Sequence, residues 1–111
     1  DLTARAMGAE LVVVAAPSFF QLDADAWRWL VGGDTRERNR YEVDAPNRRL
    51  AGIAERQGLR FLDLLPPIQR GTAAGERLYF PGDGHWTSAG HALAAREIAA
   101  YLERAGLAPG P

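Results

Sequence analysis

The sequence predicts an α/β domain built on parallel strands, and three observations support that prediction. Residues 11–16 (LVVVAA) are a continuous apolar, β-branched run, which is typical of a strand covered on both faces. A second strand is predicted at residues 59–64 (LRFLDL), after a segment with helical periodicity. The resulting order of strand, helix, strand, loop and helix favours a parallel sheet with helical connections.

Helix-start and helix-stop residues bound two helices in the first half of the chain. Residues 23–31 begin at Asp23, whose carboxylate can cap the first turn. Residues 45–57 follow Asp44, a second candidate cap, and end before Gly58, where a left-handed residue commonly closes a helix. The apolar positions that predict their inner faces are Trp27, Leu30 and Val31 in the first helix and Leu50, Ile53 and Ala54 in the second.

The last third of the chain is predicted to hold a loop, a compact segment and a long helix. Pro66 and Pro67 are expected to end the second strand, and residues 70–77 (RGTAAGER) to form a flexible loop. Residues 78–86 (LYFPGDGHW) are rich in aromatic residues and glycine, and residues 88–105 follow as the last helix. The residues expected to cap, line and close that helix are Thr87 or Ser88 at its start, Leu93, Ile98, Leu102 and Ala105 along its buried face, and Gly106 at its end.

Length and composition limit what the chain can be. Its 111 residues amount to one domain, and 47% hydrophobic with 24% charged residues is the balance of a globular protein. The formal net charge of −1 gives no basic surplus, so no nucleic-acid partner is predicted. No apolar run approaches the ~20 residues that span a bilayer. The absence of cysteine excludes disulfides, thiolate metal sites and a cysteine nucleophile.

Two predicted strands make a small sheet, since three or more are normally needed for independent stability. The chain also opens at Asp1 with no initiator methionine. We therefore expect it to be the later part of a longer protein, whose preceding residues, or another chain, complete the sheet. Because ligand sites in such sheets lie at the carboxyl ends of the strands, the loops after Ala16 and Asp63 are the places to search.

The two histidines of the chain, His85 and His91, lie in one short stretch that also contains Asp83. Asp83 and His85 are two residues apart, and Gly82 and Gly84 can bend the backbone around them. A carboxylate at this spacing can accept a hydrogen bond from one imidazole nitrogen, which fixes the tautomer and leaves the other nitrogen as a general base. This arrangement is the orienting half of a nucleophile–His–Asp triad.

Two other interpretations of this stretch stay open from the residues alone. A histidine just before a helix can be simply a hydrogen-bonding loop residue, because a lone Asp-x-His is a weak pattern. Asp83, His85 and His91 are also potential metal ligands, although the neighbouring sequence offers no further strong ligand. We predict neither a metal site nor a bound cofactor.

Residues 78–102 (LYFPGDGHWTSAGHALAAREIAAYL) resemble the last block of the SGNH (GDSL-type) hydrolase superfamily, and the upstream pattern is similar to that family as well. That pattern is an apolar strand ending in Pro-Ser, a helix, and then RQGLRFLDLLPPI before the block. The resemblance implies a three-layer α/β/α sandwich with a parallel sheet, similar to flavodoxin, of which residues 1–111 would be the C-terminal half of one domain. It also implies that His85 is the general base and Asp83 its orienting partner.

The chain departs from the commonest pattern of that superfamily in two ways. One residue rather than two separates Asp83 from His85, and Trp86 follows; this D-x-H-W form resembles a branch that includes polysaccharide O-acetyltransferases such as those of alginate acetylation. Asp63, at the end of the second strand, is the alternative carboxylate, for which we favour a structural role. The family's Gly-Asp-Ser nucleophile block is absent from the chain, and Ser18 lacks a glycine elbow, so the nucleophile is expected from residues outside it.

The resemblance predicts serine-dependent ester hydrolysis, by an SGNH-type esterase or a carbohydrate O-acetyl esterase, with this chain supplying Asp83 and His85. The alternatives are a polysaccharide O-acetyltransferase and a non-catalytic α/β module that binds carbohydrate. The predicted ligand is a small-molecule or carbohydrate acyl ester, and the family suggests a periplasmic or secreted location. Trp86 is expected to line the substrate pocket. Tyr79 and Phe80 could also line it, but we expect them to pack in the core.

Overall fold

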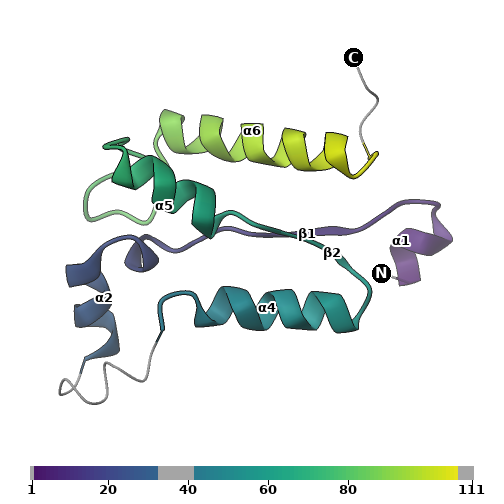
Figure 1. Ribbon diagram of the computed structural model, residues 1–111, viewed down its shortest axis with the longest axis horizontal. Coiled ribbons are helices and arrows are strands. Elements are labelled where there is room, and N and C mark those ends of the chain that lie inside the picture. The colour runs from purple at the N-terminus through teal and green to yellow at the C-terminus, as the bar shows by residue number, and fades with distance from the viewer. Residues whose placement is uncertain (1, 33–41, 108–111) are drawn as a thin grey trace.

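The computed structural model describes residues 2–32 and 42–107, which form helices, two short strands and their connections (Figure 1). In chain order, the elements are α1 (Leu2–Ala6), β1 (Val12–Ala15), the 3-10 helix η1 (Phe19–Gln21), α2 (Ala24–Val31), α4 (Ala45–Arg56), β2 (Arg60–Asp63), α5 (Leu65–Ala73) and α6 (Ser88–Arg104). None of the helices in this described part of the chain is both long and apolar enough to cross a bilayer.

The two strands pair in parallel, which confirms the α/β class predicted from the sequence. Val12 lies opposite Arg60 and Ala15 lies opposite Asp63, so both strands end at the same edge. Figure 1 shows α5 and α6 on one side of the strands and α4 on the other, which is the layering of an α/β/α fold. At the shared carboxyl edge gather η1, α2 and the connection between α5 and α6.

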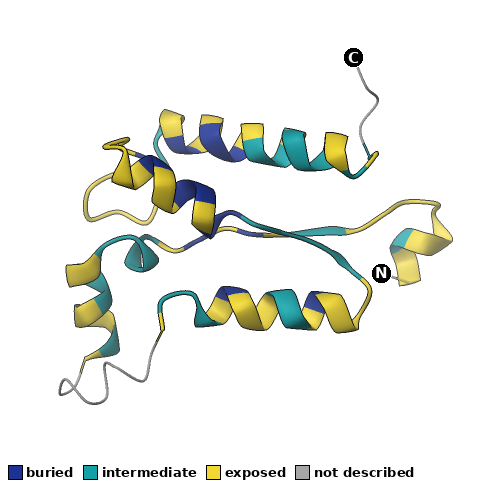
Figure 2. Ribbon diagram, viewed as in Figure 1, coloured by how far each residue is buried: buried dark blue, intermediate teal, exposed yellow. Residues whose placement is uncertain are grey.

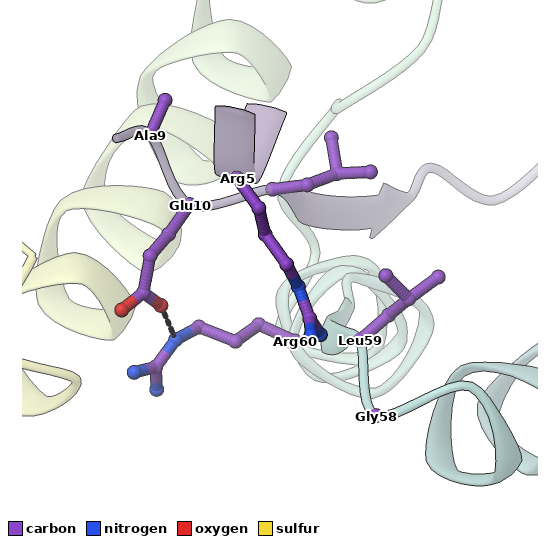
Figure 3. Close-up of a pocket in the computed structure, with 7 residues that line it drawn as sticks. Arg5, Ala9, Glu10, Gly58, Leu59 and Arg60 are labelled. Carbon is purple, nitrogen blue, oxygen red and sulfur yellow. Dashed lines mark hydrogen bonds and ion pairs between the residues drawn. The ribbon is translucent and has the colours of Figure 1, made fainter. Parts of the chain in front are cut away.

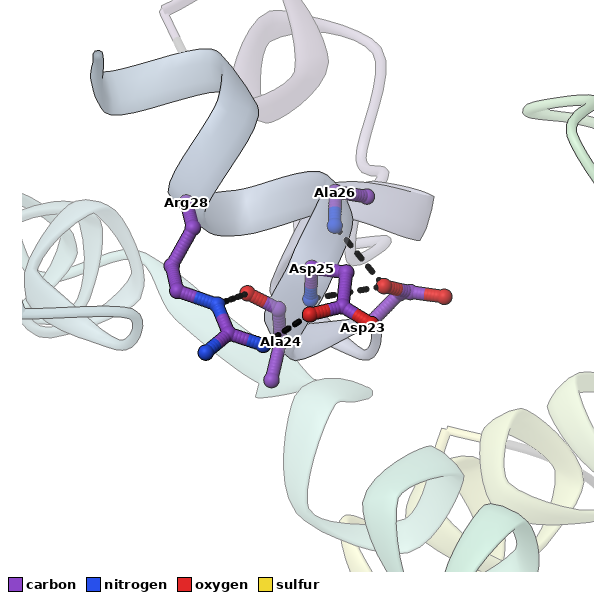
Figure 4. A network of polar contacts seen from close by, with 5 residues as sticks. All are labelled: Asp23, Ala24, Asp25, Ala26 and Arg28. Carbon is purple, nitrogen blue, oxygen red and sulfur yellow. Dashed lines mark hydrogen bonds and ion pairs between the residues drawn. The ribbon is translucent and has the colours of Figure 1, made fainter.

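The two predicted aspartate caps behave differently. Asp23 has the extended backbone of an N-cap, and its Oδ1 accepts hydrogen bonds from the backbone N–H groups of Asp25 at 2.9 Å and Ala26 at 2.8 Å (Figure 4). Asp44 makes no such bond, because its backbone is already helical (φ −94°, ψ −1°), and its carboxylate pairs with Arg48 instead. The expected cap at Asp23 is therefore confirmed, and the one at Asp44 is wrong.

Helix α5 is the main departure from the sequence-based expectation, which ended a strand at two prolines and placed a loop at residues 70–77. Pro66 and Pro67 lie in the first turn of α5, where a missing N–H costs nothing and the fixed φ suits a helix. The Asp63 carboxylate accepts a hydrogen bond from the first N–H of the helix at 2.9 Å. Ile68 is fully buried, so tertiary packing holds a helix over residues with weak helical signals.

The core lies between α5, α6 and the connection that joins them, as the dark residues in Figure 2 show. Its buried side chains are Leu64, Ile68, Leu78, Tyr79, Leu93 and Ala94. On the face predicted for the last helix, Leu93 is buried, and Ile98, Leu102 and Ala105 are half-buried. The first turns of α6 therefore contribute most to the core.

The inner faces predicted for α2 and α4 are covered less completely. Leu30 of α2 is exposed, and on α4 only Ala54 is buried, whereas Leu50 and Ile53 are exposed. Val14 of β1 is also exposed, so the expectation that this strand is covered on both faces is wrong for the chain as it stands. The physical reason is that α4 packs mainly on the two strands and α2 mainly on η1, so within the described residues few elements converge on either apolar face.

Candidate active site

The predicted Asp-x-His stretch forms the turn of a short β-hairpin, residues 78–87, which we call the His hairpin. Tyr79 and Trp86 form an antiparallel bridge, and the Phe80 N–H donates to the His85 carbonyl at 3.1 Å. The turn between them is closed by the Asp83 N–H, which donates to the Phe80 carbonyl at 3.1 Å. Within this turn Gly82 adopts a left-handed backbone (φ +67°), which confirms one of the two glycines expected to bend the chain.

Asp83 and His85 contact each other inside the turn of the His hairpin. Oδ1 of Asp83 accepts the backbone N–H of His85 at 3.0 Å and also contacts Nδ1 of the His85 ring. Both contacts from His85 lower the pKa of the Asp83 carboxyl below its ordinary value, and the ring contact has the larger effect. The His85 side chain is 86% exposed. The contact expected from the spacing is present, and the catalytic roles of the two residues stay a prediction.

The His hairpin is joined to α6 through Thr87. Of the two caps predicted for this helix, Thr87 and Ser88, the N-cap is Thr87. Thr87 Oγ1 accepts the Gly90 N–H at 3.2 Å and donates to the Arg77 carbonyl at 2.7 Å. Gly90 packs its Cα against the first strand of the hairpin, since a Cβ built there would lie 2.3 Å from the Leu78 carbonyl oxygen. The absence of a side chain at Gly90 therefore allows α6 to approach the backbone of Leu78 closely.

The aromatic residues of the hairpin divide between its two faces. Tyr79 is 8% exposed and packs in the core, as expected, and Trp86 is half-buried, edge to face with Tyr79 at a centroid distance of 6.2 Å. Phe80 is 50% exposed, so its expected place in the core is wrong. Successive side chains of an extended strand point to opposite faces, and Tyr79 occupies the inner one. The His91 ring stands edge to face on Trp86 at 5.4 Å.

A buried polar network that the sequence analysis missed connects the carboxyl ends of the strands. Asn47 is 4% exposed, and its Nδ2 donates to Asp63 Oδ1 at 2.6 Å. Its Oδ1 accepts a hydrogen bond at 2.8 Å from Nε2 of Gln21, which also donates to the Val43 carbonyl. Asparagine is so often exposed on helices that its type and position gave no signal of this role. In this network Asp63 has the kind of structural contacts that we favoured for it.

Ser18 belongs to the same strand-end region and acts as a cap. Its Oγ accepts the Phe20 N–H at 3.4 Å, and its own N–H donates to Oε1 of Gln21 at 3.0 Å. These two bonds form a capping box around η1.

Cavities lie at both edges of the sheet, and the described residues contain no cluster of metal ligands. Within residues 2–32 and 42–107, no three histidine, aspartate or glutamate side chains gather in a group that could hold a metal ion. A pocket of about 440 Å³ lies at the amino edge of the sheet, where Glu10 pairs with Arg60 (Figure 3). A smaller groove of about 230 Å³ lies beside the His hairpin, lined in part by Phe19 and Pro81.

A family model described as "SGNH hydrolase-like domain, acetyltransferase AlgX" matches residues 3–110. The chain belongs to this SGNH hydrolase-like family. Searches among curated proteins and among solved structures gave no match to the chain. The superfamily resemblance predicted from residues 78–102 is therefore confirmed, and the family's members are esterases or acyltransferases.

The His hairpin of this SGNH hydrolase-like chain sits at the carboxyl edge of the parallel sheet. The Tyr79 hydroxyl donates to the carbonyl of Pro17, which lies two residues after the end of β1 and is buried. Ligands in open α/β sheets bind outside this edge, so the groove beside the hairpin, and not the larger pocket at the amino edge, has the position of a ligand site.

Proposed function

We propose that this chain supplies the histidine–aspartate pair of a serine-dependent acyl-transfer site that cleaves carboxylic esters. The observation that supports it most directly is that one oxygen, Asp83 Oδ1, contacts both the backbone N–H and the ring Nδ1 of His85. With Nδ1 as donor to the carboxylate, Nε2 is left unprotonated and can accept a proton. The exposure of the ring leaves Nε2 open to a nucleophile that residues 1–111 do not supply.

The proposed reaction has two halves. A serine hydroxyl attacks the acyl carbonyl carbon while Nε2 of His85 takes the serine proton, and the same proton then passes to the departing alcohol. A second hydroxyl attacks the acyl-serine, its proton passes to Nε2 and then to the serine oxygen, and the acylated acceptor leaves. Asp83 stays ionised and stabilises the imidazolium formed in each half.

The two candidate activities differ in the molecule that accepts the acyl group from the serine. Water as acceptor makes the protein an esterase, which is the activity predicted from the superfamily resemblance. A sugar hydroxyl makes it a carbohydrate O-acetyltransferase, and this candidate is favoured by the description of the matching family and by the D-x-H-W form at Asp83–Trp86. In either case Trp86 is proposed to form a wall of the acyl or sugar pocket.

The test uses the full-length protein with para-nitrophenyl acetate as donor, with and without an oligosaccharide acceptor. We expect His85→Ala to lower turnover about 10²- to 10⁴-fold, because a positioned general base contributes a factor of that size. Nitrophenol release measures donor cleavage, and mass spectrometry of the sugar measures transfer. His91→Ala is the matched control, since it removes the other histidine, which lies on α6 outside the turn that holds Asp83, and it should keep most of the activity.

Three outcomes would contradict parts of this proposal. Full activity in His85→Ala would remove the assigned base. A large loss in Asp63→Asn together with none in Asp83→Asn would show that the wrong carboxylate was chosen. Carbohydrate binding by a wild-type protein that never turns over an acyl donor would favour the non-catalytic module.

A further inference from the structure

The His hairpin is too short to hold its own position. It has one antiparallel bridge, between Tyr79 and Trp86, which is flanked by two backbone hydrogen bonds, and its turn is closed by a third. An isolated two-stranded hairpin is marginally stable at best in water. His85 itself cannot stabilise the turn by packing, because its side chain is largely exposed. The placement of His85 relative to the sheet therefore depends on contacts between the hairpin and other elements.

The hairpin packs into the core through Tyr79, and some of its other contacts are local in the chain. Thr87 and Gly90 join the hairpin to α6, which begins directly after it. One polar contact is not local: the Tyr79 hydroxyl donates to the Pro17 carbonyl, 62 residues away. It links the hairpin to the segment that leaves the carboxyl end of β1. Burial raises the pKa of the Tyr79 phenol above its ordinary value, which keeps the hydroxyl protonated and able to donate.

Tyr79 is placed so that its position sets the position of His85. It is bridged to Trp86, which follows His85, and it precedes Phe80, whose N–H donates to the His85 carbonyl. The Tyr79 ring also contacts Phe19 of η1, with centroids 6.2 Å apart. A shift of Tyr79 therefore moves Trp86, which follows His85 in the chain, and Phe80, which is hydrogen-bonded to His85.

Pro17, whose carbonyl accepts this bond, belongs to a segment that several hydrogen bonds hold in place. Pro17 is followed by the capping box of Ser18 and Gln21. Gln21 is in turn bonded to the buried Asn47, which is bonded to Asp63 at the end of β2. The Pro17 carbonyl is thus fixed relative to both strands of the sheet, and it offers a defined reference point for the hairpin.

We propose that Tyr79 is a positioning residue, whose hydrogen bond to the Pro17 carbonyl sets where the His hairpin presents His85 relative to the carboxyl edge of the sheet. The inference rests on the proposed function, because its effect is exerted on the proton transfer by His85. Catalytic groups must be held close to their reactive geometry, and a misplacement of about 1 Å costs on the order of 10²-fold in rate.

The test compares Tyr79→Phe with Tyr101→Phe in the full-length protein. Tyr79→Phe keeps the ring and removes only the donor, whereas Tyr101 lies near the end of α6, away from the hairpin, and serves as the matched control. We expect Tyr79→Phe to lower kcat roughly ten- to hundredfold with KM nearly unchanged. The pH profile should keep its shape, because the contact between Asp83 and His85 lies within the hairpin. Tyr101→Phe should match the wild type.

A merely structural role would give a different pattern. Loss of stability alone would lower the melting temperature and the number of sites titrated by an acylating serine reagent, but it would leave kcat per titrated site unchanged. That result would overturn the inference. If Tyr79→Phe does not fold, difluorotyrosine at position 79 replaces it, and its activity should fall at alkaline pH where the more acidic phenol loses its proton and can no longer donate. Wild-type activity that persists in that variant would also overturn it.

The outcomes separate this inference from the proposed function. A wild-type protein with no activity on any acyl donor contradicts the proposed function. An active wild type that is silenced by His85→Ala but unaffected by Tyr79→Phe contradicts only the positioning role.

Discussion

The two sides of the sheet differ in how they are packed. On one side, α5, α6 and the His hairpin surround a core that includes fully buried Ile68. On the other side, α4 lies against the strands with Ala54 buried and with Leu50 and Ile53 exposed. The candidate catalytic pair belongs to the first side, and the second side is connected to it through the buried amide of Asn47.

A helix with a regular apolar pattern does not necessarily bury the face that carries it. The helical spacing on α4 is as regular as that on α6, yet the two helices bury different fractions of it. Leu93 of α6 meets Leu78 and the helix α5, so its neighbours come from two other segments of the chain. Burial depends on how many elements converge on a position, and this number is larger on the hairpin side.

The largest effect expected from this difference is on stability after truncation of isoleucine. Ile68→Ala should lower the free energy of unfolding by about 2–5 kcal/mol, because it removes a buried side chain and leaves a cavity. Ile53→Ala, the same change at a position that is 40% exposed, should cost about 1 kcal/mol or less. Urea unfolding of both variants measures the difference. Equal losses would show that the two sides are packed alike.

A smaller effect, with opposite signs on the two sides, is expected from glycine replacement within helices. Gly90→Ala should destabilise by about 1–3 kcal/mol, because its Cβ would meet the Leu78 carbonyl oxygen and the hairpin would have to shift. Gly52→Ala on α4 would meet only the end of the flexible Arg56 side chain, and it should stabilise by about 0.5–1 kcal/mol through helix propensity. Thermal unfolding of the pair checks the signs. A neutral Gly90→Ala would show that the hairpin is not seated against α6 as described.

The smallest effect concerns ionisation in the His hairpin. Because contacts from His85 depress the pKa of Asp83, the stability they add is present above the unfolded-state pKa of about 4 and is lost as pH falls through the lower folded-state pKa. A carbon NMR titration of the Asp83 carboxyl should find its midpoint below the ordinary value. In His85→Ala the midpoint should return towards that value. An unchanged midpoint in this variant would mean that the contact does not exist in solution.

The candidate pair was accessible from the sequence because its geometry is local. Asp83 and His85 are two residues apart, and the turn that contains them has a left-handed glycine, Gly82, directly before Asp83. The same holds for the cap at Asp23, whose partners follow it within three residues. The helical position of Pro66 and Pro67 depends on the burial of Ile68 in the core. The spacing of residues in the sequence does not indicate which side chains are buried there.

The parallel α/β class, the Asp23 cap and the contact between Asp83 and His85 are predictable from the sequence, since each depends on residues close together in the chain or on a repeating pattern. The burial of the apolar faces, and the bonds from Tyr79 to Pro17 and from Asn47 to Asp63, became apparent from the folded chain. Such bonds form where distant segments meet, and the type of a side chain does not indicate which remote residue it contacts.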